Sequence, residues 1–329
     1  MANPERLACH GTDSQDLVAV VGAGALGRWL AVRLQVGGHA VRLVTRPGSR
    51  SHLLKCSVTG AGTTLDQEVE SMPARNYESG TFRWVLYCTK AGDLEQAAQE
   101  TASLLSPEGW SVVLSNGLGH ADTLAECGLH RSLAATVTYG LCPVSGGAVE
   151  QRGSGGQVTV GPIAVDPSSR GTEFEAAFEA SQLLAGIFRC AGLMSEAVED
   201  GAELVWRKAT LNAGLNSVAA LLRCENGELP AHPSFQLAIE AAREVILVAR
   251  EAGVDLSKDD PEQLLRDLCR DTATNRCSTL QDLEASRTTE MEWICGAVVR
   301  IAERAGLEVP ANRLLAKMVQ EAESSCVSV

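Results

Sequence analysis

Short apolar runs separated by glycine-rich and polar segments dominate the first half of the chain. The run at residues 17–21 is typical of a buried parallel strand. After it we expect a glycine turn, a helix to about Gln35 and a strand at 40–44. Later runs predict a helix at 93–105 and strands at 82–88, 111–114, 134–138 and 157–160. This alternation of strands and helices favours a parallel sheet.

Longer amphipathic segments take over in the second half. The pattern predicts helices at about 172–190, 199–223, 233–253, 261–271, 279–305 and 311–323. We therefore expect an α/β, Rossmann-type dinucleotide-binding domain followed by an all-α domain. The predicted boundaries are a polar tail at 1–16, the nucleotide domain at 17–198 and the helical domain at 199–329.

Composition and charge narrow the class of protein. The 329 residues carry a formal net charge of -13, which argues against general binding to nucleic acid or to an anionic membrane. The sequence holds no apolar run long enough for a membrane helix, and its first residues lack the apolar core of a signal peptide. We expect a soluble cytoplasmic protein, and the sequence leaves a homodimer open.

The cysteines and histidines do not suggest a metal site. Eleven cysteines are scattered without a CxxC spacing, and six histidines form neither HxxxH nor HExxH. Cys88, Cys190 and Cys295 lie in apolar surroundings, which favours reduced core thiols. A catalytic or redox-sensing cysteine remains the alternative.

A glycine motif lies between the first predicted strand and helix. Its residues, Gly22, Ala23, Gly24, Ala25, Leu26 and Gly27, match GxGxxG. The first glycine permits a tight turn, the second lets a pyrophosphate approach the backbone, and the third allows close packing of helix and strand. The helix N-terminus favours the phosphate charge. The motif in this context predicts dinucleotide binding, although glycines also serve ordinary turns.

The end of the second predicted strand favours NADP(H) over NAD(H). An NAD site usually has an acidic residue there to bind the ribose hydroxyls, whereas this chain has Thr45 and Arg46. A guanidinium can bind a 2′-phosphate with two hydrogen bonds. The alternative for Arg46 is a solvated loop cation.

A polar stripe runs along the predicted helix at 199–223. Lys208, Asn212 and Asn216 are four residues apart, so they share one helix face over roughly 12 Å. A cation and two amides on a mostly apolar helix need partners, which suggests a wall for a polar ligand. The alternatives are a lysine that extends its ammonium to solvent and asparagines that pack between helices.

Other polar residues lie where a ligand could reach them. Lys90 and Asn116 follow predicted strands, at the sheet edge where ligands bind, although Asn116 could form an ordinary turn. Ser278 precedes Gln281 in a capping-box pattern, so it could cap a helix, bind a carboxylate or do both. Glu290 lies beside the apolar face of its predicted helix and could orient Lys208, bind a ribose hydroxyl or pair with Arg287.

An ordered series of further motifs resembles the ketopantoate reductase (2-dehydropantoate 2-reductase) family over nearly the whole chain after the tail. Several are weak singly, and their order and spacing carry the resemblance. They are Thr89-Lys90-Ala91, Asn116-Gly117-Leu118-Gly119, Trp206-Arg207-Lys208 with Asn212, Asn226-Gly227-Glu228-Leu229, Ser278-Thr279-Leu280-Gln281-Asp282, Thr289-Glu290, Gly296 and Val309-Pro310-Ala311-Asn312.

The resemblance implies reduction of ketopantoate by NADPH to pantoate, a step toward pantothenate and coenzyme A. It implies that Lys208 is the catalytic lysine and that Glu290 is an acid near both the lysine and the cofactor. It assigns four residues to the substrate: Asn212, Asn216, Asn226 and Ser278. It assigns three to the cofactor site: Lys90, Asn116 and, through its backbone, Leu141.

Three departures from the family pattern bear on the substrate. Asp93 replaces a frequent glutamine, Gln151-Arg152 replaces a histidine-bearing turn, and the N-terminal tail is long. A related reductase for another 2-oxo acid or an imine is therefore an alternative. A non-catalytic NADPH-binding regulator is another, but it would have no need of a proton donor such as Lys208.

Overall fold

The computed structural model describes residues 17–49, 51–60, 62–152, 155–163 and 171–327. Within these ranges the chain folds into two compact units. The first contains the residues up to Thr89 together with Gln96–Leu114 and Cys127–Glu199. The second contains Asp200–Val329 and two short segments, Lys90–Glu95 and Ser115–Glu126. The polar tail expected at 1–16 lies outside the described residues.

An eleven-stranded sheet organises the described part of the first unit. Its strand order is β11-β10-β7-β6-β5-β1-β2-β4-β3-β9-β8. The strands are β1 (Val18–Val21), β2 (Val41–Thr45), β3 (His52–Gly60), β4 (Thr63–Pro73), β5 (Phe82–Tyr87), β6 (Leu105–Val113), β7 (Ser132–Val137), β8 (Gly140–Pro143), β9 (Val149–Arg152), β10 (Val158–Pro162) and β11 (Ser195–Ala197).

The centre of the sheet follows the sequence pattern. All four residues of β1 are buried, and β1 pairs in parallel with β2 on one side and β5 on the other. A strand with two neighbours and two covered faces needs apolar residues throughout, which explains the uninterrupted run. The predicted strand at 17–21 is therefore confirmed.

The expectation of a parallel sheet is correct for the central strands and for two outer pairs, β10–β11 and β3–β9, but not for the whole sheet. Antiparallel pairing joins β3 to β4, β7 to β10 and β8 to β9. The β3–β4 hairpin was not predicted, although Cys56 and Val58 alternate with more exposed residues along β3. One face of this hairpin faces solvent, so its residues lack the continuous apolar run of a central strand.

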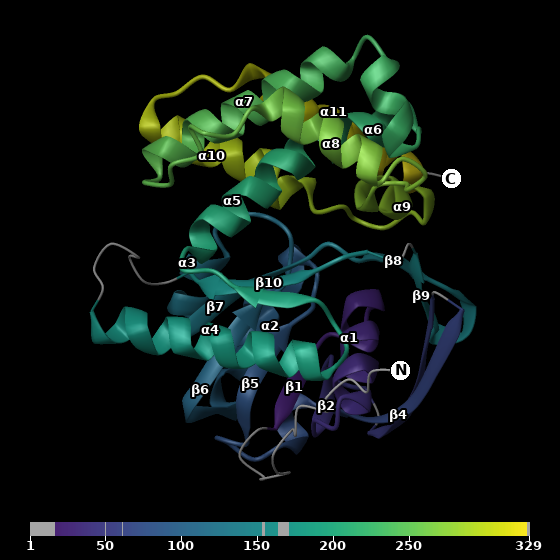
Figure 1. The fold of residues 1–329 in the computed structure, drawn as a ribbon, viewed down its shortest axis with the longest axis vertical. Helices are drawn as coiled ribbons and strands as arrows, with labels where there is room; N and C mark the ends of the chain where they lie inside the picture. The colour runs from purple at the N-terminus through teal and green to yellow at the C-terminus, as the bar shows by residue number, and fades with distance from the viewer. Residues whose placement is uncertain (1–16, 50, 61, 153–154, 164–170, 328–329) are drawn as a thin grey trace, which may run out of the picture. The chain divides into compact units, whose positions relative to one another are not determined.

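Three long or medium helices accompany the sheet: α1 (Ala25–Val36), α2 (Leu94–Thr101) and α4 (Thr172–Cys190). Helix α4 lies along the sheet beside β10 (Figure 1), and it also contacts β11. It confirms the helix predicted at 172–190, and it belongs to the first unit. Helix α1 contacts β3 and β4 and also β8 and β9, which are distant in sequence. It therefore packs against the edge of the sheet that β3, β9 and β8 form. Trp29 and Leu30 of α1 are fully buried in this core.

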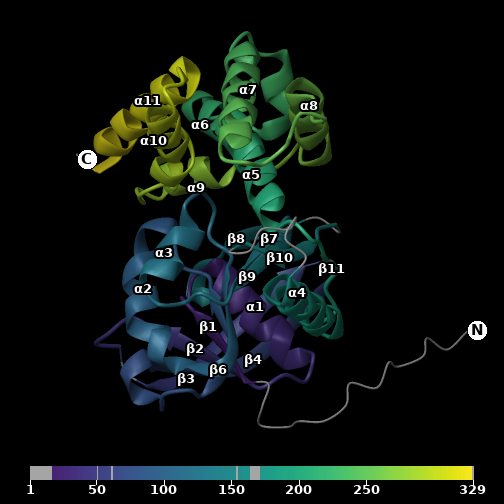
Figure 2. The same cartoon turned by 90° about the vertical axis from the view of Figure 1, so that its left-hand side faces the viewer.

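The second unit is helical. Its helices are α3 (His120–Glu126), α5 (Gly201–Leu211), α6 (Ser217–Leu222), α7 (Phe235–Glu251), α8 (Pro261–Asp271), α9 (Ser278–Glu284), α10 (Cys295–Ala305) and α11 (Pro310–Val327). Helix α7 buries an apolar face that includes Ala238, Val245 and Val248. Figure 2 shows α10 and α11 side by side, in agreement with their contacts.

Two of the predicted helices are interrupted. The helix expected at 199–223 contains a π-helical turn at Asn212–Asn216 between α5 and α6. The helix expected at 279–305 is wrong as a single element, because α9 ends at Glu284 and α10 begins at Cys295. A short 3-10 helix, Met291–Trp293, lies between them.

Candidate active site

The glycine turn has the geometry that each of its glycines was expected to serve. Gly22 adopts a φ of +103°, which L side chains rarely adopt. A Cβ added to Gly27 would lie 1.9 Å from the carbonyl oxygen of Gly22, so only glycine allows this approach of helix to strand. Around Gly24, in contrast, no described atom would lie within 4 Å of such a Cβ. The turn therefore leaves open space at the N-terminus of α1, as a bound pyrophosphate requires.

The end of β2 presents the arginine expected to bind a 2′-phosphate. Arg46 is exposed and follows Thr45, the last residue of the strand. Its carbonyl oxygen accepts a hydrogen bond from the backbone N–H of Ser49 at 3.2 Å, which closes a turn. No acidic residue occurs at 45–49.

Three of the four residues assigned to the substrate form one hydrogen-bonded group. The Asn216 amide donates to Asn212 Oδ1 at 3.2 Å and to Ser278 Oγ at 3.5 Å. The π turn carries both asparagines, so their spacing from Lys208 is not that of a straight α-helix as expected. Such turns widen a helix by one residue and often lie at functional sites.

Lys208 lies in the last turn of α5, and the π turn begins at Asn212, directly after this helix. Burial lowers the pKa of its ammonium to about 8, and the negative charge of Glu290 acts in the opposite direction. A lysine with such a pKa can release a proton near neutral pH. The two residues were expected to act together, and the structure places each within the electrostatic reach of the other.

Two donors from distant segments hold the Glu290 carboxylate. Asn116 Nδ2 donates to Oε2 at 2.7 Å, and the backbone N–H of Ala91 donates to Oε1 at 3.2 Å. Glu290 is buried and immediately precedes the 3-10 helix Met291–Trp293, so its expected position on a long helix is wrong. Its suggested pairing with Arg287 is also wrong, because Arg287 Nε donates to Asp282 Oδ1 at 3.0 Å.

Asp282 is the last residue of one of the motifs above, but no role was assigned to it from the sequence. Its buried carboxylate accepts hydrogen bonds from the ammonium of Lys90 and from Arg287. The alternative in which Ser278 caps the helix is wrong, because Cys277 is the N-cap of α9 and its Sγ accepts from the N–H of Leu280 at 3.4 Å. Ser278 is therefore left with an exposed position next to Asn216.

Asn116-Gly117 is more than an ordinary turn. The carbonyl oxygen of Trp293 accepts from the N–H of Leu118 at 2.9 Å, and a Cβ on Gly117 would lie 2.6 Å from that oxygen. His120 Nε2 lies 2.9 Å from the Asn116 carbonyl oxygen, and burial lowers the pKa of this histidine. These contacts fix the loop that presents Asn116 to Glu290.

Two expected site residues are not part of this network. The amide nitrogen of the buried Asn226 donates to Thr272 Oγ1 at 2.9 Å, which ties it to the end of α8. Leu141 lies in β8 of the first unit, where it is in register with Gln151 of β9. The glycine turn and Arg46 also belong to the first unit, whereas Lys90 and Asn116 belong to the second.

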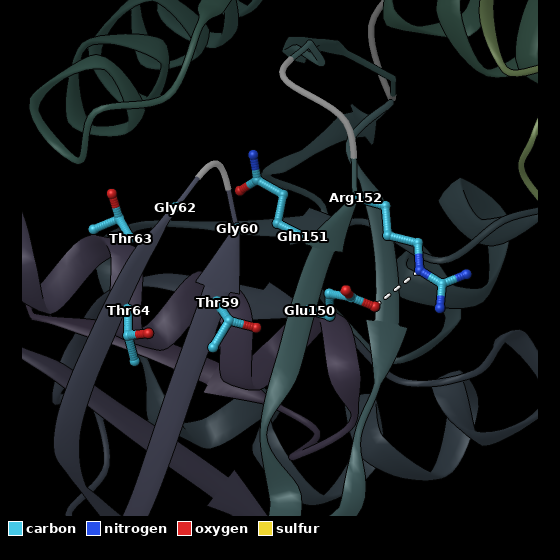
Figure 3. Close-up of a pocket in the computed structure, with 8 residues that line it drawn as sticks. All are labelled: Thr59, Gly60, Gly62, Thr63, Thr64, Glu150, Gln151 and Arg152. Carbon is cyan, nitrogen blue, oxygen red and sulfur yellow. Dashed lines mark hydrogen bonds and ion pairs between the residues drawn. The ribbon is translucent and has the colours of Figure 1, made fainter.

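A polar surface pocket in the first unit contains none of the residues that the sequence assigned to the cofactor or the substrate (Figure 3). It lies at the β3–β4 turn and β9, and its lining residues are Thr59, Gly60, Gly62, Thr63, Thr64, Glu150, Gln151 and Arg152. The Arg152 guanidinium donates to Glu150 at 2.9 Å beside it. The pocket is open to solvent and carries no catalytic group of the network above.

The nine cysteines whose side chains the structure describes are free thiols, and one of them differs from the expectation of a buried position. Cys88 and Cys295 are buried as expected, whereas Cys190 at the end of α4 is exposed. Burial raises the pKa of Cys277 to about 12, which disfavours the reactive thiolate.

Among the described residues, no helix has the length and apolar character to cross a membrane.

Family models match both units of the chain. Residues 18–164 match the model described as "Ketopantoate reductase PanE/ApbA". Residues 201–323 match "Ketopantoate reductase PanE/ApbA C terminal".

Curated relatives agree. The chain is 31% identical over 308 residues to a 2-dehydropantoate 2-reductase of Archaeoglobus fulgidus, covering 93% of this chain and 98% of that protein. It is 35% identical over 222 residues to the Pyrobaculum aerophilum protein of the same name, covering 67% and 72% of the two chains.

Solved structures share the fold. A PanE/ApbA family ketopantoate reductase from Ralstonia eutropha JMP134 superposes with a TM-score of 0.79 at 26% identity, covering 94% of this chain and 99% of that chain. A D-mandelate dehydrogenase solved with NADH and anilino(oxo)acetate gives a TM-score of 0.82 at 22% identity, with the same coverage, which is a likeness of fold alone. The chain therefore belongs to the ketopantoate reductase family and is an oxidoreductase that acts on a CH–OH group.

Proposed function

We propose that this protein reduces ketopantoate to pantoate with NADPH, and that Lys208 donates the proton. The observation that carries the proposal is the Lys208–Glu290 arrangement. Burial lowers the pKa of the lysine to about 8, while the charge of a carboxylate held by two hydrogen bonds keeps that pKa from falling further. The lysine is thus protonated at neutral pH and still able to give up its proton.

The first unit supplies a place for the cofactor. The open glycine turn and the N-terminus of α1 suit the pyrophosphate, and the exposed Arg46 suits a 2′-phosphate. NADPH, when bound, supplies the hydride. We assign the preference for NADPH to Arg46, since the segment after β2 has no acid to bind the ribose hydroxyls or to repel a phosphate.

The second unit supplies proton transfer and substrate recognition. Hydride addition to the ketone carbon leaves the electron pair of the C=O bond on oxygen, and that oxygen takes a proton from Lys208 Nζ. Solvent then reprotonates the lysine. A cation at the developing alkoxide lowers the barrier because it interacts more strongly with the transition state than with the ketone.

Asn212, Asn216 and Ser278 provide polar groups for a small hydroxylated acid. Because the Asn216 amide bridges the other two, the three side chains are ordered before a ligand arrives. Preorganised donors and acceptors can distinguish a substrate hydroxyl from an apolar substituent, since a buried polar group without a partner is costly. This favours ketopantoate, which carries a hydroxyl, over 2-oxo acids with purely apolar side chains.

An NADPH-oxidation assay with a panel of 2-oxo acids tests the proposal. The panel should contain ketopantoate, its analogue without the hydroxyl and an aromatic 2-oxo acid. The proposal expects the highest kcat/KM for ketopantoate. A higher value for another acid would retain the reaction class and replace the substrate. NADPH binding without turnover of any acid would instead favour a regulator.

A further inference from the structure

Side chains from α1 reach the β8–β9 hairpin, although the two elements are more than a hundred residues apart in sequence. Arg28 Nη1 donates to the Gly147 carbonyl oxygen at 2.9 Å. Trp29 Nε1 and Arg33 Nη2 donate to Gln151 Oε1 at 3.0 and 2.8 Å. Gln151 is 9% exposed, so its oxygen is a buried acceptor that these two donors satisfy.

Arg28 also bonds to the glycine turn itself. Its Nε donates to the carbonyl oxygen of Ala23 at 2.7 Å. One guanidinium therefore joins the turn at Gly22–Gly27 to the loop Ser145–Gly147 at the tip of the hairpin. The planar fork of an arginine can serve two carbonyl groups in fixed directions, which a lysine cannot.

The hairpin loop is shaped around this guanidinium. A Cβ added to Gly147 would lie 1.9 Å from Arg28 Nη1, so a side chain there would displace the arginine. The preceding residue, Gly146, also has a positive φ, but no described atom would lie within 4 Å of its Cβ. The close fit is thus a property of Gly147 and not of the loop as a whole.

The bond to Ala23 has a consequence for the next residue. The Ala23 carbonyl and the Gly24 N–H belong to one planar trans peptide, so they point in opposite directions and rotate together. Holding the carbonyl fixes the direction of the Gly24 N–H. Glycine at this position gives the peptide a wider range of orientations than another residue would.

We propose that Arg28 is a positioning residue for the dinucleotide: tied to Gly147, it holds the Ala23–Gly24 peptide in the orientation that binds the cofactor's pyrophosphate. Gln151 supports this arrangement by holding the hairpin against Trp29 and Arg33. The inference rests on the proposed binding of a dinucleotide at the glycine turn. It also gives a role to Gln151, one of the positions at which the chain departs from the family pattern.

The first experiment measures the Kd for NADPH by calorimetry in the wild type, Arg28→Met and Arg28→Lys. Loss of this preorganisation should raise the Kd for NADPH about tenfold in Arg28→Met, which is the scale of one lost charged hydrogen bond. Arg28→Lys should recover only part of the affinity. At saturating NADPH, kcat should stay within about twofold of wild type, because Arg28 does not take part in proton transfer. An unchanged Kd in a folded Arg28→Met protein would overturn the inference.

A matched pair of glycine variants separates the clash from backbone strain. Gly147→Ala should weaken NADPH binding about as much as Arg28→Met does. Gly146→Ala should have little effect, although the φ of Gly146, +73°, is close to the +82° of Gly147. In the Arg28→Met background, Gly147→Ala should raise the Kd for NADPH no further than Gly146→Ala does. Equal weakening by the two alanines in the wild-type background would overturn the role of Arg28. A wild type that binds neither NADPH nor NADH would overturn the proposed function and this inference with it.

Discussion

Asn116 donates a hydrogen bond to the Glu290 carboxylate, with 2.7 Å between Nδ2 and Oε2. The two residues are 174 positions apart in sequence. The second carboxylate oxygen accepts from the backbone of Ala91, so two short segments and the α9–α10 connection meet at one charge. That charge opposes the effect of burial on the pKa of Lys208.

Glu290→Gln should shift the pH dependence of reduction toward acid. The proton donor works only while it is protonated, so kcat/KM of the wild type should fall as the pH rises through about 8. Removing the carboxylate charge lowers the pKa of Lys208 further, and the fall should begin at lower pH. Glu292→Gln is the control, since Glu292 pairs with Arg300 and is more exposed. Superimposable profiles for wild type and Glu290→Gln would exclude this coupling.

Gly117→Ala should destabilise the protein far more than Gly119→Ala. Both glycines have positive φ, +113° and +88°, but only at Gly117 would a Cβ meet a neighbour, the Trp293 carbonyl oxygen at 2.6 Å. Strain and overpacking together should cost about 2–5 kcal/mol at Gly117, against about 1 kcal/mol of strain at Gly119. Urea unfolding measures both values, and equal losses would show that the contact with Trp293 has no energetic weight.

The sequence predicted those parts of the fold and site that depend on local pattern. The run that forms β1 and the glycine turn after it were recognisable because each residue's role is set within one strand–turn–helix unit. The break between α9 and α10 was not, since it contains no glycine or proline. A distant partner contributes to it: the N–H of Thr289 donates to Glu323 at 2.7 Å, while Arg287 donates to the nearby Asp282 at the end of α9.

The same distinction applies to the site. Lys208 and the asparagines could be grouped from their spacing on one helix. The pairing of Lys90 with Asp282 joins residues 192 positions apart, and no local pattern encodes it. The π turn that carries Asn212 and Asn216 was also hidden, because its residues fit an ordinary helix equally well.

Arg46→Ala should weaken the binding of NADPH much more than the binding of NADH. If the guanidinium binds the 2′-phosphate, its loss should cost about 1.5–3 kcal/mol of NADPH binding and leave NADH almost unaffected. Arg75→Ala, at another exposed arginine of the first unit, is the control for a general loss of positive charge. The measurement is the Kd for both dinucleotides. Equal weakening of NADPH and NADH would argue against a contact with the 2′-phosphate.

Asn212→Ala should raise the KM for the 2-oxo acid and leave the Kd for NADPH unchanged. The side chain lies at the start of the π turn and accepts from Asn216, so its loss also releases that second amide. Losing one or two hydrogen bonds to substrate should raise KM by about tenfold or more. Asn275→Ala is a control at a half-buried asparagine outside the Lys208 stripe. An unchanged KM together with weaker NADPH binding would move Asn212 from the substrate to the cofactor.

The most direct test of the account is the kcat of Lys208→Ala, measured in steady state at saturating NADPH with circular dichroism to confirm folding. If Lys208 protonates the alkoxide, kcat should fall about 10²–10⁴-fold, and the Kd for NADPH should change far less. Lys208→Arg should restore little, because arginine keeps the charge but does not readily release a proton. A folded Lys208→Ala enzyme with near-normal kcat would contradict the account and remove Lys208 from the mechanism.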